Sequence, residues 1–402
     1  MGQDGLERVY DGYLRGEDGG QQVRISNQGQ RIGVIGYRKP IPGDDLILTI
    51  DKKMQEVAWD SLRGRPGAIV ALDPRTGKVL ALVSSPAFDP NLFVPRISKK
   101  KWFSLKENPL HPLINRAIQG QYAPGSIFKV ITTLAALEKG LISRDERFSC
   151  SGTFPFKDRE FRCWRREGHG ELNLKEAIIH SCDIFFYQLG LRVGVDNLVE
   201  LSQKFGLDQP TRIGLSHEEK GFLPTKRWRK SSLGRGWYKG DTVNLSIGQG
   251  YLLVTPLQMA SLMNAIANGG RLYEPQLVKE IISSEGETIW RMTPRLIRNI
   301  NLESETIEFL RESLFGVVNE LGTGWRAKIE GVGVAGKTGT AENPLGEDHA
   351  WFIGFAPREK PEIALAVLIE HGGMGGEVAA PVAKKIIEAY FTGKRESKKV
   401  SR

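Results

Sequence analysis

The sequence predicts a mixed α/β (α+β) fold, in which an antiparallel sheet flanked by helices carries an inserted helical subdomain. Strand-like apolar runs occur early and late in the chain, and a long, mostly helical stretch lies between them. No internal repeat is present. With 402 residues, the chain is longer than one average domain and can bury a sizeable core.

The early strands are predicted at residues 46–50, 68–72 and 79–83, with a helix at about 52–62 between the first two. Residues 73–77 read Asp-Pro-Arg-Thr-Gly, which is typical of a turn. The second and third strands should therefore form a hairpin.

The middle of the chain begins with an apolar helix that starts near Ser126. The other elements follow in order: a polar loop at 143–170, helices at 172–191 and after Thr255-Pro256, a strand meander at 331–341, 351–356 and 363–368, and a helix at 381–390. This order predicts a sheet built from both ends of the chain.

The composition limits both the binding partners and the location that we expect for the protein. The net charge of +9 suits an acidic surface, polymer or substrate, but the basic residues are mostly scattered, so no nucleic-acid partner is expected. No apolar window is long enough to span a bilayer, and the polar N-terminus is not a signal peptide. The chain should be either cytosolic or a soluble piece of a longer protein.

We expect three segments along the chain. Residues 1–45 are rich in Gly, Gln and Arg and read as short strands and loops without a core of their own. Residues 46–393 hold the main domain. Residues 394–402 are basic and are predicted to be a disordered tail.

The most informative motif is Ser126-x-x-Lys129, which follows Pro124-Gly125. Residues three apart on a helix share a face, about 5–6 Å apart at Cβ. Lys129 is the only charged residue between 123 and 137, so desolvation should favour its neutral amine, which can take the serine proton. The alternative is a lysine whose ammonium reaches the surface.

Two further motifs follow in order. Ser181-x-Asp183 interrupts an apolar segment, where polar groups need hydrogen-bonded partners or a site. Lys337-Thr338-Gly339-Thr340 lies on a glycine-rich strand, and an ammonium beside hydroxyls can bind a carboxylate. The same spacings occur at Ser98-Lys101 and Ser143-Asp145, which lie in polar segments. Spacing alone is therefore weak evidence for an active-site motif.

This ordered triple motif resembles that of penicillin-binding proteins and serine β-lactamases from about residue 45 onward. Flanking segments narrow the resemblance to the penicillin-binding protein 2 group of class B transpeptidases. These segments are Leu82–Asn91, Gly168-His169-Gly170, Gly240-Asp241-Thr242, Ile247–Gly250 and Thr255-Pro256. The resemblance implies a penicillin-binding-protein-like transpeptidase fold and an enzyme of cell-wall elongation and cell shape.

The resemblance also implies roles. Ser126 would attack the amide between two terminal D-alanines of a peptidoglycan stem peptide, Lys129 would act as base, and Ser181 would relay the proton. Lys337 and Thr338 would hold the terminal carboxylate, with Gly339 and Thr340 on the same strand. The backbone N–H groups of Ser126 and Thr340 would form the oxyanion hole. β-Lactams would acylate Ser126, and catalysis would need no cofactor.

The second motif usually ends in asparagine, and Asp183 departs from this pattern. An ionised carboxylate only accepts hydrogen bonds, so Asp183 would either contact the substrate or pair with Lys129 or Lys337. The resemblance further implies a membrane anchor and a pedestal (dimerisation) domain, of which residues 1–45 would be the end. The whole protein would lie in the bacterial inner membrane with its catalytic domain in the periplasm, and its partners would include a membrane glycosyltransferase and a cell-shape scaffold protein.

The three cysteines and one histidine fall in a single window: Cys150, Cys163, His169 and Cys182. Their spacing is a weak metal signal, but Cys₃His is a complete tetrahedral zinc set, and some members of the group carry zinc beside the second motif. A structural Zn²⁺ is therefore expected. The alternative is a Cys150–Cys163 disulfide with Cys182 buried and free.

Two other functions share the triple motif: a serine β-lactamase and a β-lactam sensor domain. A β-lactamase needs a group that hydrolyses the acyl-enzyme quickly. Glu171-Leu172-Asn173 superficially resembles such a group, but it precedes the second motif, whereas the deacylating Glu of one β-lactamase class follows it. We interpret Glu171 as unrelated to catalysis.

Overall fold

The computed structural model describes residues 2–94, 97–157, 159–344 and 346–400, with side chains described through Lys394. It divides into two compact units. The first comprises Met1–Thr49, Arg212–His217 and Gln276–Thr293, and the second comprises the remaining residues. Within the described ranges, no helix is long and apolar enough to cross a bilayer.

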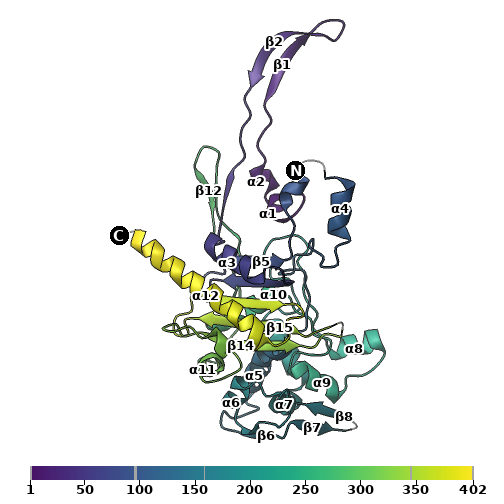
Figure 1. The fold of residues 1–402 in the computed structure, drawn as a ribbon, viewed down its shortest axis with the longest axis vertical. Helices are drawn as coiled ribbons and strands as arrows, with labels where there is room; N and C mark the ends of the chain where they lie inside the picture. Colours follow the sequence, from purple (N-terminus) through teal and green to yellow (C-terminus); the bar gives the residue numbers. More distant parts are fainter. Residues whose placement is uncertain (1, 95–96, 158, 345, 401–402) are drawn as a thin grey trace. The chain divides into compact units, whose positions relative to one another are not determined.

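The first unit consists of small, separately paired elements. Strands β1 and β2 form an antiparallel hairpin (Figure 1) whose apolar side chains are exposed, and a three-stranded sheet has the order β12-β11-β3. Its elements are α1 (Gly5–Val9), α2 (Asp11–Leu14), β1 (Gly20–Ile25), β2 (Arg31–Arg38), β3 (Asp45–Leu48), β11 (Val278–Ile282) and β12 (Thr288–Arg291). The strand predicted at 46–50 is β3, which ends at Leu48.

The second unit is built on a five-stranded antiparallel sheet with the strand order β14-β15-β16-β4-β5. Its strands are β4 (Gly67–Leu72), β5 (Val79–Ser85), β14 (Ala335–Ala341), β15 (His349–Ala356) and β16 (Ile363–Ile369). The predicted hairpin and late meander are confirmed. The strand predicted from residue 331 begins only at Ala335, because Gly331 has φ +72° and lies in a turn closed by Ile329 and Val332.

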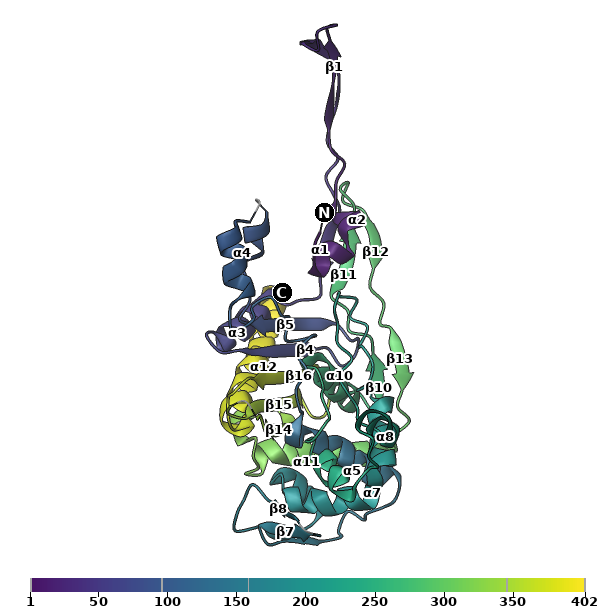
Figure 2. The same cartoon turned by 90° about the vertical axis from the view of Figure 1, so that its right-hand side faces the viewer.

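Helices cover both faces of this sheet (Figure 2). One face packs on α3 (Lys52–Leu62) and α12 (Gly375–Val400), and the other packs on α10 (Pro256–Ala267). Because both faces are covered, β4 and β16 are buried at every position, which explains their continuous apolar runs. The sheet therefore forms a rigid platform for its edge strand β14.

The inserted helical part lies beside β14 and contains most of the remaining elements. Its helices are η2 (Gly125–Phe128), α5 (Lys129–Glu138), α6 (Leu174–Ile179), α7 (Asp183–Lys204), α8 (Lys226–Leu233), α9 (Lys239–Ser246) and α11 (Ser304–Asn319). The other elements of the second unit are η1 (Pro90–Phe93), α4 (Lys99–Lys106), β6 (Phe148–Cys150), β7 (Thr153–Phe156), β8 (Arg159–Arg162), β9 (Gly170–Leu172), β10 (Arg271–Tyr273), β13 (Leu296–Asn299) and η3 (Trp325–Ala327).

Three further predicted boundaries were wrong. The polar loop at 143–170 contains the short strands β6, β7 and β8, and the mostly exposed positions of β7 and β8 hide their pairing from sequence patterns. The helix at 172–191 is interrupted between α6 and α7. The C-terminal helix extends beyond 381–390 in both directions, and α12 continues through Val400 across most of the segment that we expected to be a tail. Residues 401–402 lie outside the described residues.

Candidate active site

A cavity of about 640 Å³ opens in the second unit beside the sheet edge. It brings together six of the residues that the three motifs predict: Ser126, Ser181, Asp183, Thr338, Gly339 and Thr340. Lys129 and Lys337 do not line it. Both are about 1% exposed, and their ammonium groups lie behind Ser181. The site therefore has a hydroxyl-lined surface backed by two buried amines.

The nucleophile turn is held against the strand that carries the third motif. Gly125 has φ +57°, and a Cβ atom there would lie 2.5 Å from the Thr340 carbonyl oxygen, so only glycine allows this approach. Ser126 follows in the 3₁₀ turn η2, which runs directly into α5. No hydrogen bond joins its hydroxyl to another described residue, and Ser126 faces the cavity.

Lys129 is directed at the second motif. Its Nζ donates to Asp183 Oδ1 at 2.7 Å, to the Ser181 carbonyl at 2.9 Å and to Ser181 Oγ at 3.2 Å. The buried Lys129 side chain therefore pairs with a carboxylate instead of reaching the surface. The sequence did not reveal this partner.

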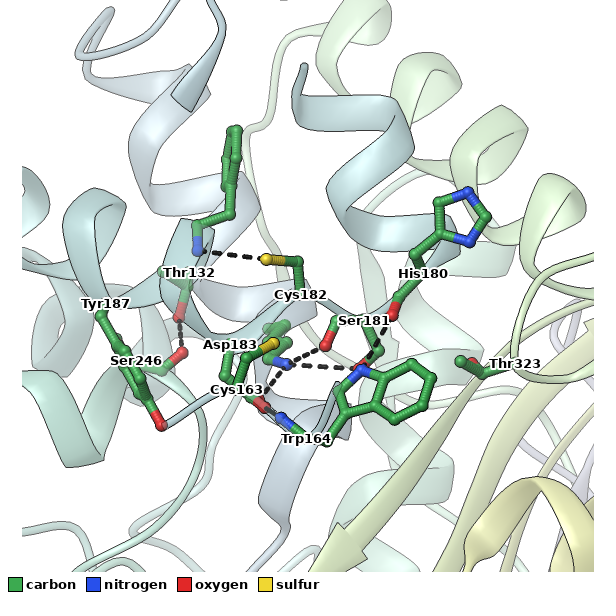
Figure 3. Close-up of polar contacts among 12 residues, drawn as sticks. Thr132, Cys163, Trp164, His180, Ser181, Cys182, Asp183, Tyr187, Ser246 and Thr323 are labelled. Carbon is green, nitrogen blue, oxygen red and sulfur yellow. Dashed lines mark hydrogen bonds and ion pairs between the residues drawn. The ribbon is translucent and has the colours of Figure 1, made fainter. Parts of the chain in front are cut away.

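Ser181 reaches both lysines because the chain breaks between two helices. It has φ +53°, a left-handed conformation that is uncommon for a residue other than glycine. This conformation interrupts the helical path after α6, and α7 starts two residues later. Figure 3 shows the side chains of Ser181, Cys182 and Asp183 at this break. Ser181 Oγ thereby accepts hydrogen bonds from Lys129 and, at 2.8 Å, from Lys337.

The structure explains why an acid occupies position 183. Asp183 Oδ1 accepts from the Lys129 ammonium, and Oδ2 accepts from the backbone N–H of Trp164 at 2.9 Å. Because both partners are donors, an asparagine would turn its NH₂ group toward one of them. Of the alternatives left by the sequence, pairing with Lys129 is the one that the structure contains.

Lys337 is buried beside a second lysine and a carboxylate. Burial, reinforced by the charge of Lys129 and opposed by Asp183, lowers the pKa of Lys337 well below its ordinary value. Besides Ser181, its Nζ donates to the Thr338 carbonyl at 3.1 Å. The Thr338 hydroxyl, in turn, lies 2.6 Å from the hydroxyl of Thr323. These two threonines line the cavity, whereas Lys337 does not.

Sequence reasoning missed several residues of the cavity wall, including Thr323, Trp164 and Tyr187. Thr323 lies in Leu-Gly-Thr-Gly-Trp, a glycine-rich turn that could have been recognised. Nothing in the sequence distinguishes Trp164 from other loop aromatics. Its place in the wall depends on contacts with the distant turn at His180–Asp183.

A buried polar network fixes the segment that leads to Ser126. The Tyr122 hydroxyl donates to Glu370 at 2.6 Å, and Arg116 pairs with the same carboxylate at 2.7 Å. The Tyr122 ring packs edge-on against Trp351, whose indole donates to the Ala123 carbonyl at 3.1 Å. These contacts tie the nucleophile turn to β15 and to the end of β16.

The predicted metal-ligating residues also converge. The ligand atoms of Cys150, Cys163, His169 and Cys182 all lie within 4.8 Å of one another, and all three cysteines are free thiols. The contact with Cys182 lowers the pKa of the Cys163 thiol to about 3 against the opposing effect of burial. This favours a thiolate. Cys182 lies between Ser181 and Asp183, so the cluster adjoins the second motif.

Comparison with known proteins supports this description. The family model "Penicillin binding protein transpeptidase domain" matches residues 67–388, and the "Penicillin-binding Protein dimerisation domain" model matches residues 1–48. The peptidoglycan D,D-transpeptidase MrdA of Acinetobacter baumannii is 38% identical over 99% of this chain, and that of Escherichia coli is 34% identical over 98%. The chain spans 61% and 65% of the lengths of these two relatives.

Solved structures show the same similarity. PBP2 of Pseudomonas aeruginosa in complex with WCK 5153 matches 97% of this chain and 82% of its own, with 36% identity and a TM-score of 0.83. The PBP2–MreC complex of Helicobacter pylori matches 98% of this chain and 73% of its own, with 30% identity and a TM-score of 0.86.

Proposed function

Because the chain belongs to the penicillin-binding protein transpeptidase family, we propose that it is a peptidoglycan D,D-transpeptidase that acts through a Ser126 acyl-enzyme. The observation that carries the proposal is the convergence of the three motifs on one cavity, with Ser126 free to react and two buried lysines behind Ser181. The substrate is a stem peptide ending in D-Ala-D-Ala, and β-lactams are covalent inhibitors.

In this mechanism, the Ser126 oxygen attacks the carbonyl between the two D-alanines, and its proton passes to the amine of Lys129. The backbone N–H groups of Ser126 and Thr340 stabilise the oxyanion. Ser181, hydrogen-bonded to both lysines, relays the proton to the departing amine, and the C–N bond breaks with release of D-alanine. An amine from a second stem then attacks the ester, forms the cross-link and returns the proton to Ser126.

The hydroxyls of Thr338 and Thr340, with Gly339 between them, suit the terminal carboxylate of the donor. Lys337 contributes from behind Ser181. In the free enzyme, Lys129 is paired with Asp183, so this contact must loosen before Lys129 can take the proton of Ser126. Lys337, whose pKa is lowered by burial, is the neighbouring amine that can take part in this transfer through Ser181.

Fluorescent penicillin tests the proposal. Stable labelling that mass spectrometry maps to Ser126, and that Ser126→Ala abolishes without loss of fold, is the expected result. Rapid release of the label would instead support the β-lactamase alternative, and the absence of labelling would contradict the transpeptidase, β-lactamase and sensor functions together. Glu171 does not favour a β-lactamase, because it is exposed on β9 and is not part of the cavity lining.

We further propose that Cys150, Cys163, His169 and Cys182 bind a structural Zn²⁺. His169 Nδ1 lies 3.6 Å from Cys150 Sγ and 3.5 Å from Cys163 Sγ. Tetrahedral zinc, with bonds of about 2.3 Å to sulfur and 2.0 Å to nitrogen, separates these atoms by about 3.5 Å. About one zinc per chain in chelator-free protein, reduced by Cys150→Ser, is expected. A zinc content well below one ion per chain would contradict the proposed zinc site.

Residues 1–45 are proposed to end a pedestal domain and residues 46–393 to form the transpeptidase domain of a membrane-anchored periplasmic enzyme of cell-wall elongation. The match of residues 1–48 to the dimerisation model supports this. Partners would be a lipid-II-polymerising glycosyltransferase and a cell-shape scaffold protein such as the MreC found with the H. pylori relative. Ile35, 58% exposed on β2, offers a test, since Ile35→Asp should weaken scaffold binding without affecting penicillin labelling.

A further inference from the structure

Four large apolar side chains are exposed around the catalytic cavity although nothing in the reaction requires them. They come from three separate segments of the chain. These residues and their exposed fractions are Trp164 (50%), Leu321 (91%), Trp325 (54%) and Met374 (52%). Exposed apolar groups gathered at one site mark a ligand-binding surface more often than isolated ones do.

Trp164 is fixed in position although half of it is exposed. Its indole N–H donates to the His180 carbonyl at 3.1 Å, and its ring meets His169 edge-on at 5.5 Å. Figure 3 shows the ring beside Ser181 and His180. A ring held in this way offers a flat apolar face to a ligand with little further loss of conformational freedom.

Trp325 is held in a comparable way by a different set of contacts. The Arg326 guanidinium lies 4.8 Å from its ring centre, and Arg326 pairs with Glu377 at 3.6 Å. Trp325 lies two residues beyond Thr323, whose hydroxyl contacts Thr338 on the strand of the third motif. Trp325 therefore lines the same cavity as the threonines that suit the terminal carboxylate of the donor.

The reacting end of the proposed substrate is too small to use these rings. Two D-alanines present two methyl groups and a carboxylate, which Ser126, Thr338 and Thr340 can already accommodate. We propose that Trp164 and Trp325 are specificity-determining residues that contact the glycan-peptide strand beyond the D-Ala-D-Ala end. This inference rests on the proposed function and adds the part of the substrate that the site recognises.

Competition against penicillin labelling of Ser126 tests the inference without requiring turnover. Two competitors are compared on the same chain: a short N-acylated peptide ending in D-Ala-D-Ala, and a glycan strand carrying the same stems. The readout is the ratio of the concentrations at which they halve the labelling rate. The wild type should favour the strand, and Trp164→Ala or Trp325→Ala should reduce this preference by roughly tenfold, as loss of a buried aromatic contact does.

Matched controls separate ring contacts from general effects. Trp59 and Trp102 are 42% and 39% exposed but do not line the cavity, so Trp59→Ala and Trp102→Ala should keep the wild-type ratio. Trp164→Phe and Trp325→Phe retain a flat ring and should restore most of the preference.

Equal potency of strand and short peptide on the wild type would overturn the inference. An equal loss of potency for both competitors in the alanine variants would also overturn it, because the rings would then position the catalytic groups instead. Failure of penicillin to label wild-type Ser126 would count against the proposed function itself. The two failures are therefore distinguishable.

Discussion

Replacement of Asp183 by asparagine tests how the second motif is held together. The carboxylate accepts from the Lys129 ammonium through one oxygen and from the Trp164 backbone through the other. Asparagine keeps the shape of the side chain but removes its charge, and it turns an NH₂ group toward one of two donors. We expect Asp183→Asn to lower the free energy of unfolding.

The size of the effect follows from burial. The side chains of Lys129 and Asp183 are 1% and 12% exposed, and their charges lie 2.7 Å apart. Removal of one partner from a buried pair costs about 3–5 kcal/mol. Asparagine still accepts one hydrogen bond, which is worth about 1 kcal/mol. The net loss should be about 2–4 kcal/mol.

Urea denaturation of the purified chain measures this loss. Asp196→Asn is the matched control, because Asp196 lies on the same helix and pairs with Lys226, but its side chain is 74% exposed. Loss of an exposed pair should cost about 0–1 kcal/mol. If Asp183→Asn destabilises the protein no more than Asp196→Asn does, the buried pair does not stabilise the site as argued.

The remaining predictions concern the other buried polar groups. Lys337→Met should abolish penicillin labelling but raise the free energy of unfolding near neutral pH, because burial lowers the pKa of Lys337 in the folded protein and protonation therefore opposes folding. This stability gain should shrink as the pH rises toward 10.5, and denaturation midpoints at several pH values that show a flat or growing gain would contradict it. Tyr122→Phe removes a hydrogen bond to the ionised Glu370 and should cost about 1.5–3 kcal/mol in urea denaturation, whereas Tyr251→Phe, at an exposed position, should cost much less. Equal losses in the two tyrosine variants would count against a stabilising role for the Tyr122 network.

Much of the fold could be predicted from the sequence because its signals are local. The apolar runs that became β4, β5, β15 and β16, the Pro-Gly turn after residue 72 and the capped helix α10 each depend on residues within a few positions of one another. The short strands of residues 153–162 could not be predicted in this way, because they form a hairpin with mostly exposed side chains.

The sequence by itself determined the chemistry that is available: a serine nucleophile, two lysines, a threonine-rich strand and a Cys₃His set. Tertiary structure decided how these groups are used. It pairs Lys129 with Asp183, 54 positions away, and brings Lys337 to Ser181 across 156 positions. It also sets the ring of Trp164 against the turn that carries Ser181. Such contacts depend on how helices pack against the sheet edge, so no local pattern encodes which donor meets which acceptor.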